Sequence, residues 1–209
     1  MPQQSSFWNK QATRYDAAIS DHDAQYATRL NQLKQLIKPT DVVLDFGCAS
    51  GEIALDLAPH VKSIEGIDPA NAMIELAYNK AAKRDIRNAS FLTADIFDPR
   101  LEPESYDAIL AFNVMHLVKD HHEVIHRAKT LLKPGGMLFV ETPCLGEFTW
   151  WKRHIILTAS ALRLAPFIHV YKFGEPEAEL KAHDFQILGA RNAPEQDCRA
   201  SIAAQKPTE

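Results

Sequence analysis

Residues 42–58 read VVLDFGCASGEIALDLA and carry the strongest indication of the fold. The apolar, β-branched run at 42–46 is typical of a buried parallel strand. A short turn with Gly47 and Gly51 follows, and a helical pattern begins at once and continues to about residue 58. A strand, a glycine turn and a helix in this order are the layout of a nucleotide-binding loop. The stretch therefore predicts an α/β fold with a ligand loop after its first strand.

Predicted strands and helices alternate along the rest of the chain. Apolar runs predict further strands at 63–68, 89–95, 106–112 and 136–143. Helical patterns lie between most of them, including 121–132, which the sequence KPGG should end. Repeated strand–helix units predict a parallel, doubly wound sheet. The strand patterns at 185–191 and 199–205 have no obvious helix between them, which predicts an antiparallel hairpin at one edge.

Composition and charge bound the class of protein. A length of 209 residues fits one domain, 1–209, and the net charge of -4 provides no global basic field for nucleic acid. The cysteines Cys48, Cys144 and Cys198 are odd in number and far apart, so we expect no disulfide framework and a reducing, cytoplasmic location. The N-terminus lacks a signal-peptide core, and no apolar run reaches the roughly 18 residues of a membrane span.

The turn departs from the dinucleotide fingerprint G-x-G-x-x-G. Counted from Gly47, Ala49 occupies the second glycine position, where a pyrophosphate approaches, and Glu52 occupies the third. An acid at residue 52, where the helix opens, would repel a diphosphate. The turn therefore argues against NAD as the ligand.

The pattern D-x-G-x-x-x-G, formed by Asp45, Gly47 and Gly51, resembles motif I of class I S-adenosylmethionine-dependent methyltransferases. That cofactor has no phosphate and carries a cationic amino-acid tail, so a carboxylate before the loop can balance its ammonium group. Ala49 adds one methyl group, which we expect to be tolerated with a negative φ. The segments GIDPANAMIELA, TADIFD, YDAILAFNVMHLV and LLKPGGMLFV look like later motifs of this family, and the resemblance covers residues 30–143.

The resemblance implies a Rossmann-like, doubly wound, seven-stranded sheet of order 3-2-1-4-5-7-6 with an antiparallel seventh strand, and S-adenosyl-L-methionine as cofactor. It also implies that Asp68 bonds the ribose hydroxyls and that Asp95 bonds the adenine amino group, with Ile96 beside the ring. The expected cofactor-binding residues are Asp45, Gly47, Cys48, Ala49, Gly51, Asp68, Pro69, Met73, Asp95, Ile96, Phe112 and Asn113.

Methyl transfer is an in-line displacement in which a dry, positioned site does much of the work. A general base is needed only when the acceptor must lose a proton, and His116 is the candidate for that role and for a substrate contact. The other interpretation of His116 is structural. Nucleic-acid amino methyltransferases carry Asn/Asp-Pro-Pro-aromatic where this chain has Asn113 to His116, so the resemblance argues against nucleic-acid bases as substrate.

The sequence HEVIH at 122–126 matches the H-E-x-x-H zinc pattern, with His122 and His126 on one helix face. The helix is the expected partner of the fourth strand, and its exposed face should be polar. We therefore expect no bound metal.

Residues 148–173 form an extra segment after the fifth predicted strand. It contains Lys152, Arg153, Arg163 and Lys172, no acid, and many large apolar residues. We expect it to form a lid over the open end of the sheet. A helix packed on the core, and a basic apolar helix lying on a membrane surface, are the alternatives.

Aromatic residues should line the substrate pocket from two sides. We expect Trp150 and Trp151 to contact substrate from the lid, and the N-terminal helices of residues 1–38 to form another part of the cover. Phe7, Trp8 and Tyr15 are the substrate candidates in those helices, with simple packing as the alternative.

The sequence thus predicts methyl transfer from S-adenosylmethionine to a small apolar or aromatic acceptor in a desolvated pocket, with an anionic group as one option for that acceptor. The nearest group resembles the ubiquinone-biosynthesis-type methyltransferases. The alternatives are a non-catalytic protein that binds S-adenosylmethionine or S-adenosylhomocysteine, an NAD-dependent oxidoreductase, and a protein methyltransferase. The acceptor atom (C, N, O or S), the pathway and the oligomeric state stay open.

Overall fold

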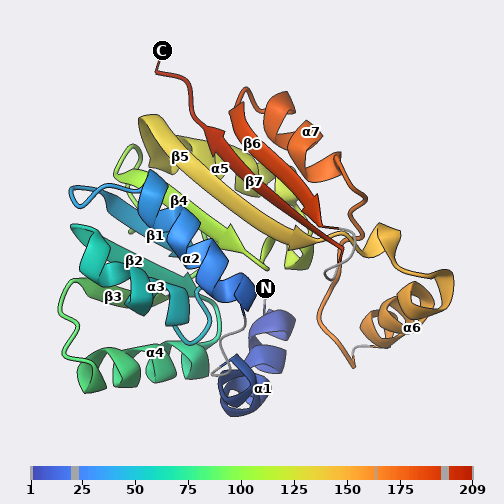
Figure 1. Cartoon of the computed structure of the whole chain (residues 1–209). Coiled ribbons are helices and arrows are strands. Elements are labelled where there is room, and N and C mark those ends of the chain that lie inside the picture. The colour runs from blue at the N-terminus through green and yellow to red at the C-terminus, as the bar shows by residue number, and fades with distance from the viewer. Residues whose placement is uncertain (1, 20–23, 163, 194–197, 209) are drawn as a thin grey trace. The chain divides into compact units, whose positions relative to one another are not determined.

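The computed structural model describes residues 2–19, 24–162, 164–193 and 198–208 (Figure 1). Its strands are β1 (Val42–Phe46), β2 (Ser63–Asp68), β3 (Ala89–Thr93), β4 (Tyr106–Phe112), β5 (Leu132–Pro143), β6 (Gln186–Ala193) and β7 (Arg199–Gln205). They form one seven-stranded sheet of order β3-β2-β1-β4-β5-β7-β6. Strand β7 runs antiparallel to both β5 and β6. The predicted strand order and closing hairpin are confirmed.

The chain divides into two compact units, Met1–Asp95 and Ile96–Glu209. The helices of the first unit are α1 (Pro2–Ile19), α2 (Ala24–Leu36), α3 (Glu52–Leu57) and α4 (Asn71–Lys83), with a 3-10 turn η1 (Ala58–His60). Those of the second are α5 (His121–Leu131), α6 (Trp150–Ala161) and α7 (Glu175–Ala182), with 3-10 turns η2 (Met115–Leu117) and η3 (Leu145–Glu147). That residues 1–209 act as a single domain stays a prediction.

In the first unit, β1, β2 and β3 pair in parallel, and Asp45 of β1 lies opposite Gly66 of β2. The apolar run of β1 explains its burial, since Val43 and Leu44 are fully enclosed. Helix α4 buries its apolar face, including Met73 and Ala77, and packs on β2 and β3. Helix α1 packs on α4 (Figure 1).

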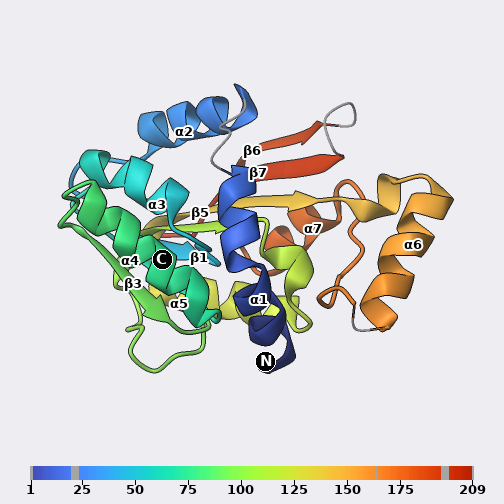
Figure 2. The ribbon, with the colours of Figure 1, turned by 90° about the horizontal axis from the view of Figure 1, so that it is seen from below.

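In the second unit, β4 and β5 are parallel, and β7 lies between β5 and β6. Helices α5 and α7 lie on the same face of these strands (Figure 2). Strand β5 starts at Leu132, four residues before the predicted start, because the KPGG sequence is absorbed as an irregularity. The pairing there jumps from Tyr106 opposite Leu132 to Ala108 opposite Met137, and Gly135 adopts φ 76° within the jump.

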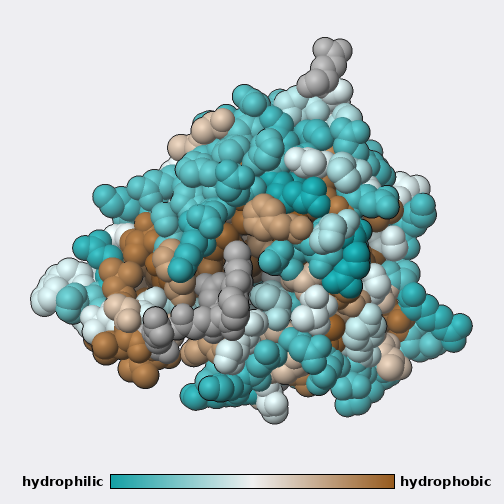
Figure 3. All heavy atoms as spheres, turned by 180° about the vertical axis from the view of Figure 1, so that it is seen from behind, coloured by the Kyte–Doolittle hydropathy of each residue, from teal (hydrophilic) through white to brown (hydrophobic). Residues whose placement is uncertain are grey.

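Helix α6 differs from the other helices of its unit because none of its residues is buried. Its exposed apolar side chains form a surface that shows brown at the edge of the molecule in Figure 3. Arg163, one of the predicted lid cations, lies outside the described residues. Along the described parts of the chain, no helix is long and apolar enough to cross a membrane.

Candidate functional site

The turn between β1 and α3 is held by backbone hydrogen bonds to the neighbouring strand. The N–H groups of Gly47 and Cys48 both donate to the Ile67 carbonyl, at 2.9 and 3.0 Å. The N–H of Gly51 donates to the Cys48 carbonyl at 2.9 Å, which closes the turn. The turn is therefore a fixed structure at the carboxyl end of β1.

Gly51 is the position in this turn where no side chain fits. It adopts φ 79°, and an added Cβ would lie 2.8 Å from Cε1 of Phe91 and 2.9 Å from Cβ of Ala77. Backbone conformation and close packing therefore both require glycine here.

Ala49 adopts φ 48°, so the expected negative φ is wrong. The Ala49 N–H donates to Oδ2 of Asp68 at 3.2 Å. An alanine in this region costs about 1–2 kcal/mol relative to its relaxed backbone. Ala49 is thus accommodated at a cost.

Two carboxyl groups stand at the ends of β1 and β2. Burial raises the pKa of Asp45 to about 7, and the nearby charge of Asp68 adds to the increase. Burial also raises the pKa of Asp68 to about 6, although its hydrogen bonds from the N–H groups of Ala70 and Ala49 oppose the increase. Among the described residues, Asp45 has no cation within ion-pair distance, although its side chain is only 4% exposed. The pair would be stabilised by a positively charged ligand.

The carboxylate of Glu52, at the start of α3, is paired with cations. It pairs with Lys80, and its Oε2 lies 2.8 Å from Nη2 of Arg84. Lys80 also contacts Ser50 at 3.1 Å and pairs with Asp16 of α1. Arg84 also pairs with Asp56, so two cations are shared among three acids, and the expectation that Glu52 repels a diphosphate stays a prediction.

Helix α1 covers the same corner of the first unit. Trp8 and Tyr15 pack against a buried cluster of Ala12, Ala70 and Met73, and their rings lie 5.5 Å apart. Asn9 accepts a hydrogen bond from the Ala72 N–H at 2.9 Å, at the start of α4. Ala49 of the predicted cofactor loop packs on the same cluster, and a substrate contact of Trp8 and Tyr15 stays a prediction.

Other predicted residues are placed as follows. The ring of Phe7 packs edge-on against Trp8, at 5.1 Å between centroids. Cys48 is buried, with a pKa raised well above its usual value by burial, and its side chain packs against Gly66 of β2. A cofactor contact of Cys48 would therefore use its backbone. Pro69 lies two residues before the start of α4, and Asp95 is half-buried after β3.

In the second unit, Ile96 is buried and its carbonyl accepts a hydrogen bond from Nε of Arg127 on α5, at 3.2 Å. Phe112 ends β4 and is half-buried. Asn113 follows it with φ 55°, and its N–H donates to the Glu141 carbonyl at 2.7 Å. Its side-chain oxygen accepts a hydrogen bond from Arg199, which leaves the amide N–H groups as its donors toward a ligand.

Arg199 and Glu141 are the polar residues that the sequence interpretation missed. Arg199 begins β7 and lies 3.4 Å from Oε1 of Glu141, whose side chain is buried in β5. The chain separates Arg199 from Asn113 by 86 residues, so no local pattern indicates the contact. A charged residue inside an otherwise apolar strand pattern was the available signal for Glu141.

His116 is half-buried in η2. Its Nδ1 lies 3.4 Å from Oγ1 of Thr142, and its carbonyl accepts a hydrogen bond from the His169 N–H at 2.7 Å. Burial lowers the pKa of His116 to about 4, and the positive charge of Arg199 contributes. The imidazole is therefore neutral at neutral pH. Trp150 and Trp151, by contrast, are 76% and 49% exposed on α6.

Comparisons with known proteins agree with the fold. A family described as a methyltransferase domain matches residues 37–182. The chain is 30% identical over 139 residues to an uncharacterised methyltransferase of Anoxybacillus flavithermus, which covers 63% of this chain and 63% of that protein. It is 31% identical over 100 residues to the ubiquinone biosynthesis O-methyltransferase of Coxiella burnetii, which covers 48% of this chain and 42% of that protein. The chain thus spans less than two thirds of the length of these relatives.

Among solved structures, the phosphoethanolamine N-methyltransferase 2 of Haemonchus contortus in complex with S-adenosyl-L-methionine has the same fold. The TM-score is 0.74 at 18% identity, over 87% of this chain and 53% of that chain. The family match, the strand order and the glycine turn lead to one conclusion. The chain belongs to the methyltransferase-domain family and to the class I S-adenosylmethionine-dependent methyltransferases, a class whose cofactor is S-adenosyl-L-methionine.

Proposed function

We propose that the protein transfers a methyl group from S-adenosyl-L-methionine to a small apolar or aromatic acceptor. The observation that carries the proposal is the pair of acids at the ends of neighbouring strands, the buried Asp45 and the half-buried Asp68. Burial raises the pKa of both carboxyl groups, which supports a ligand that brings positive charge to the pair. A cofactor with an ammonium and a sulfonium group would supply the missing positive charge.

The proposed contacts follow from this electrostatic match. Asp45 balances the ammonium group, directly or through water. Asp68 keeps lone pairs beyond those used by the N–H groups of Ala49 and Ala70, and these accept the ribose hydroxyls. Asp95 bonds the adenine amino group, with Ile96 beside the ring. The remaining proposed cofactor residues are Gly47, Cys48, Ala49, Gly51, Pro69, Met73, Phe112 and Asn113.

The acids around the turn also disfavour NAD as the ligand. Lys80 and Arg84 are shared among Asp16, Glu52 and Asp56, so the cluster beside the turn keeps a net negative charge. Beside a diphosphate, the buried carboxylate of Asp45 would face further negative charge and would be forced to stay protonated. Adenosine carrying a cationic tail satisfies the same site without that cost.

For the acceptor, we propose an in-line displacement with His116 as the proton acceptor when the nucleophile must be deprotonated. The neutral imidazole can take a proton at neutral pH, and its low basicity suits an acceptor whose proton is itself acidic. Trp8, Tyr15 and Phe7 are proposed to contact the substrate from α1. The relative from Coxiella burnetii is named for ubiquinone biosynthesis, and an aromatic acceptor of that kind is our preferred class.

We propose a further role for α6 in delivering apolar acceptors. Its residues 150–161 include Lys152 and Arg153 beside exposed Trp150, Trp151 and Ile155. A basic helix with an uncovered apolar face is suited to an anionic lipid surface. Trp150 and Trp151 then act as membrane contacts as well as substrate contacts.

Calorimetric titration with S-adenosyl-L-methionine, S-adenosylhomocysteine and NAD in parallel tests the proposal. Binding of the two sulfur compounds and none of NAD is the expected result. Asp68→Ala should weaken binding of S-adenosyl-L-methionine by at least about tenfold, because two hydrogen bonds of about 1 kcal/mol each are lost. Glu75→Ala, on the exposed side of α4, is the control and should leave affinity unchanged. NAD binding, or equal affinities for wild type and Asp68→Ala, would contradict the assignment.

A further inference from the structure

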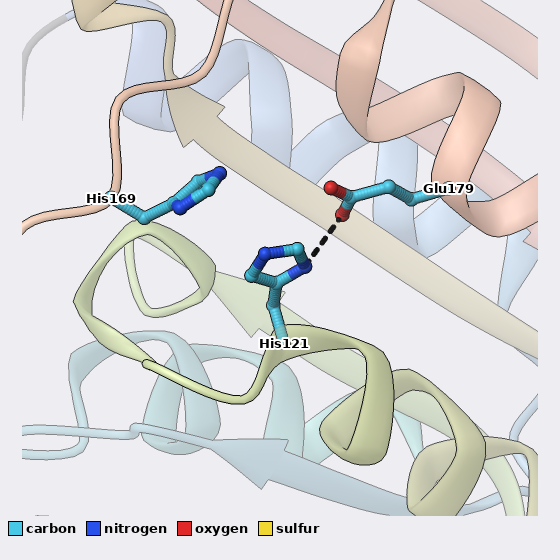
Figure 4. Close-up of side chains that lie close together, drawn as sticks. All are labelled: His121, His169 and Glu179. Atoms are coloured by element: carbon cyan, nitrogen blue, oxygen red, sulfur yellow. Dashed lines mark ion pairs between the residues drawn. The ribbon is translucent and has the colours of Figure 1, made fainter.

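Three side chains with metal-binding atoms meet in the second unit, away from the glycine turn in sequence. His121 is the first residue of α5, His169 lies in the segment between α6 and α7, and Glu179 is on α7. Figure 4 shows both imidazoles and the carboxylate pointing toward one another. One ligand atom from each lies within 4.8 Å of the other two. The topology therefore assembles two nitrogen ligands and one oxygen ligand from distant parts of the chain.

The buried nitrogen of His121 is unsatisfied in this arrangement. Its Nδ1 is shielded from solvent and has no hydrogen-bond partner among the residues that the structure describes. Oε2 of Glu179 lies 3.2 Å away, within ion-pair distance but without the geometry of a hydrogen bond (Figure 4). A buried ring nitrogen without a partner carries a desolvation cost of about 1–3 kcal/mol. A bound cation would satisfy this nitrogen and the carboxylate together.

The carboxylate has an outer partner that fixes its orientation. The hydroxyl of Tyr171 donates to Oε2 of Glu179 at 3.1 Å, and the Tyr171 side chain is almost fully buried. The rings of His169 and Tyr171 also pack edge to face, at 4.4 Å between centroids. Hydrogen bonds of this outer kind orient ligand groups in metal sites.

The chemistry of the three groups selects the metal. Imidazole nitrogens suit zinc and its neighbours in the first transition row, whereas magnesium and calcium prefer oxygen ligands alone. Two histidines and one glutamate form the ligand set of open zinc sites, in which a fourth position stays available for water or another donor. We propose that His121, His169 and Glu179 form a binding site for a divalent transition metal ion, with zinc as the preferred ion.

The distances allow this site to close with small movements. Tetrahedral zinc with bonds of about 2.1 Å sets its ligand atoms about 3.4 Å apart. Nδ1 of His121 and Oε2 of Glu179 are already at 3.2 Å. The ligand atom of His169 lies within 4.8 Å of both, so the three groups need to approach by little more than an ångström.

The site differs from the H-E-x-x-H pattern in the sequence. Of that pattern, His126 is exposed on α5, and Nδ1 of His122 lies 3.2 Å from Nε2 of His183. The proposed ligand from α5 is His121, the residue before the pattern. The expectation of no metal concerned that pattern, whereas His169 and Glu179 of the proposed site come from distant parts of the chain.

Metal binding would join three segments of the second unit. The segment that carries His169 is already tied to His116 by a hydrogen bond from the His169 N–H. Ligation of His169 would therefore fix the backbone beside the proposed base. Metal binding itself does not depend on the proposed methyl transfer, so it is tested without activity.

The test is zinc titration of the purified full chain after chelator treatment, followed by calorimetry and by the visible absorption of Co²⁺ in place of zinc. One ion per chain is expected, with the absorption typical of tetrahedral Co²⁺. His169→Ala and Glu179→Gln should each weaken binding by at least about 100-fold, since loss of an outer partner alone costs about 10–100-fold. Tyr171→Phe should lose about tenfold. His126→Ala is the matched control and should bind like the wild type.

Thermal melts of the metal-free variants check that each is folded, and His169→Ala, which lies outside the helices, keeps the test valid if a helix variant fails to fold. Zinc should raise the melting temperature of the wild type and leave that of His169→Ala unchanged. The proposal is overturned if the wild type binds no zinc. It is also overturned if His169→Ala and Glu179→Gln both bind zinc like the wild type. Loss of zinc binding in His122→Ala and His183→Ala, with binding retained in His169→Ala and Glu179→Gln, would place the metal at His122 and His183 instead.

Discussion

The glycine turn of the first unit and helix α6 of the second differ in how tightly their residues are packed. In the turn, Gly51 has no room for a single added carbon, and the N–H groups of Gly47, Cys48, Ala49 and Gly51 each have a partner. In α6, no residue is buried, and Trp150 is 76% exposed. The turn is determined by its internal geometry, whereas α6 is apolar without a covering surface in its own unit. Substitutions should therefore have large effects on stability in the turn and small effects in α6.

Gly51→Ala should give the largest loss of stability. The positive φ costs about 1 kcal/mol and the contacts with Phe91 and Ala77 add about 1–3 kcal/mol, so the free energy of unfolding should fall by about 3 kcal/mol. The melting temperature should fall by about 6–12 °C in a thermal melt. Gly174→Ala is the matched control, because Gly174 has φ 83° and nothing within 4 Å of an added Cβ. Equal losses in the two variants would show that crowding is unimportant.

Asp45→Asn should stabilise the ligand-free protein at high pH. The pKa of Asp45 is raised by folding from 3.8 to about 7, so the folded state binds this proton more tightly than the unfolded state. Stability from this group is complete below pH 3.8 and is lost as pH rises to about 7. Three pKa units correspond to about 4 kcal/mol, and local relaxation reduces the expected gain to about 2 kcal/mol at pH 8.

Chemical denaturation at pH 8 and pH 4 measures this gain, and the second pH is the internal control, where the gain should vanish. The same variant should lose affinity for S-adenosyl-L-methionine by about tenfold or more, because a charge-assisted contact is removed. A variant less stable than the wild type at pH 8 would contradict the burial argument.

Ala49→Gly tests the cost of the left-handed alanine. Relief of about 1 kcal/mol is offset by about 0.4–1 kcal/mol of extra freedom in the unfolded chain, so the variant should be up to about 0.5 kcal/mol more stable. Ala82→Gly, on the exposed side of α4, is the control and should lose about 1 kcal/mol. Denaturant titration compares the two, and similar losses in both would mean that Ala49 is unstrained.

The double variant Trp150→Ala, Trp151→Ala should have the smallest effect on stability, within about 0.5 kcal/mol. Its binding to vesicles that contain anionic phospholipid should fall severalfold in a sedimentation assay, because the exposed apolar area of α6 is reduced. Leu188→Ala, an exposed apolar residue on β6, should leave vesicle binding unchanged. Unchanged vesicle binding in the double variant would remove α6 as a membrane contact.

Local patterns predicted the strands and the closing hairpin because a run of apolar residues indicates a buried strand. The same patterns could not give the left-handed φ of Ala49 or the hydrogen bond from its N–H to Asp68, because Asp68 lies on the neighbouring strand, 19 residues away. Nor could they give the partners of Glu52, because Lys80 and Arg84 are brought to it by the packing of α4 against α3.

The contacts of the polar residues in the second unit could not be predicted from the sequence, because they join residues far apart in the chain. Arg199 reaches Asn113 and Glu141 only because β7 pairs with β5. The apolar character of residues 148–173 was visible, but composition does not say which surface covers a helix. The predicted cofactor residues stay predictions until a ligand is bound to the protein.

The position of β7 also determines the order in which the second unit can be completed on the ribosome. Among the described strands, β6 pairs with β7 alone, and β7 is the later of the two in the chain. Until residues 199–205 have left the exit tunnel, the edge of β5 that later pairs with β7 exposes unpaired backbone groups, and so does β6. The four-stranded half of the sheet therefore forms after translation has passed its last strand, and a nascent chain that pauses before this point exposes an adhesive edge to chaperones or to other nascent chains.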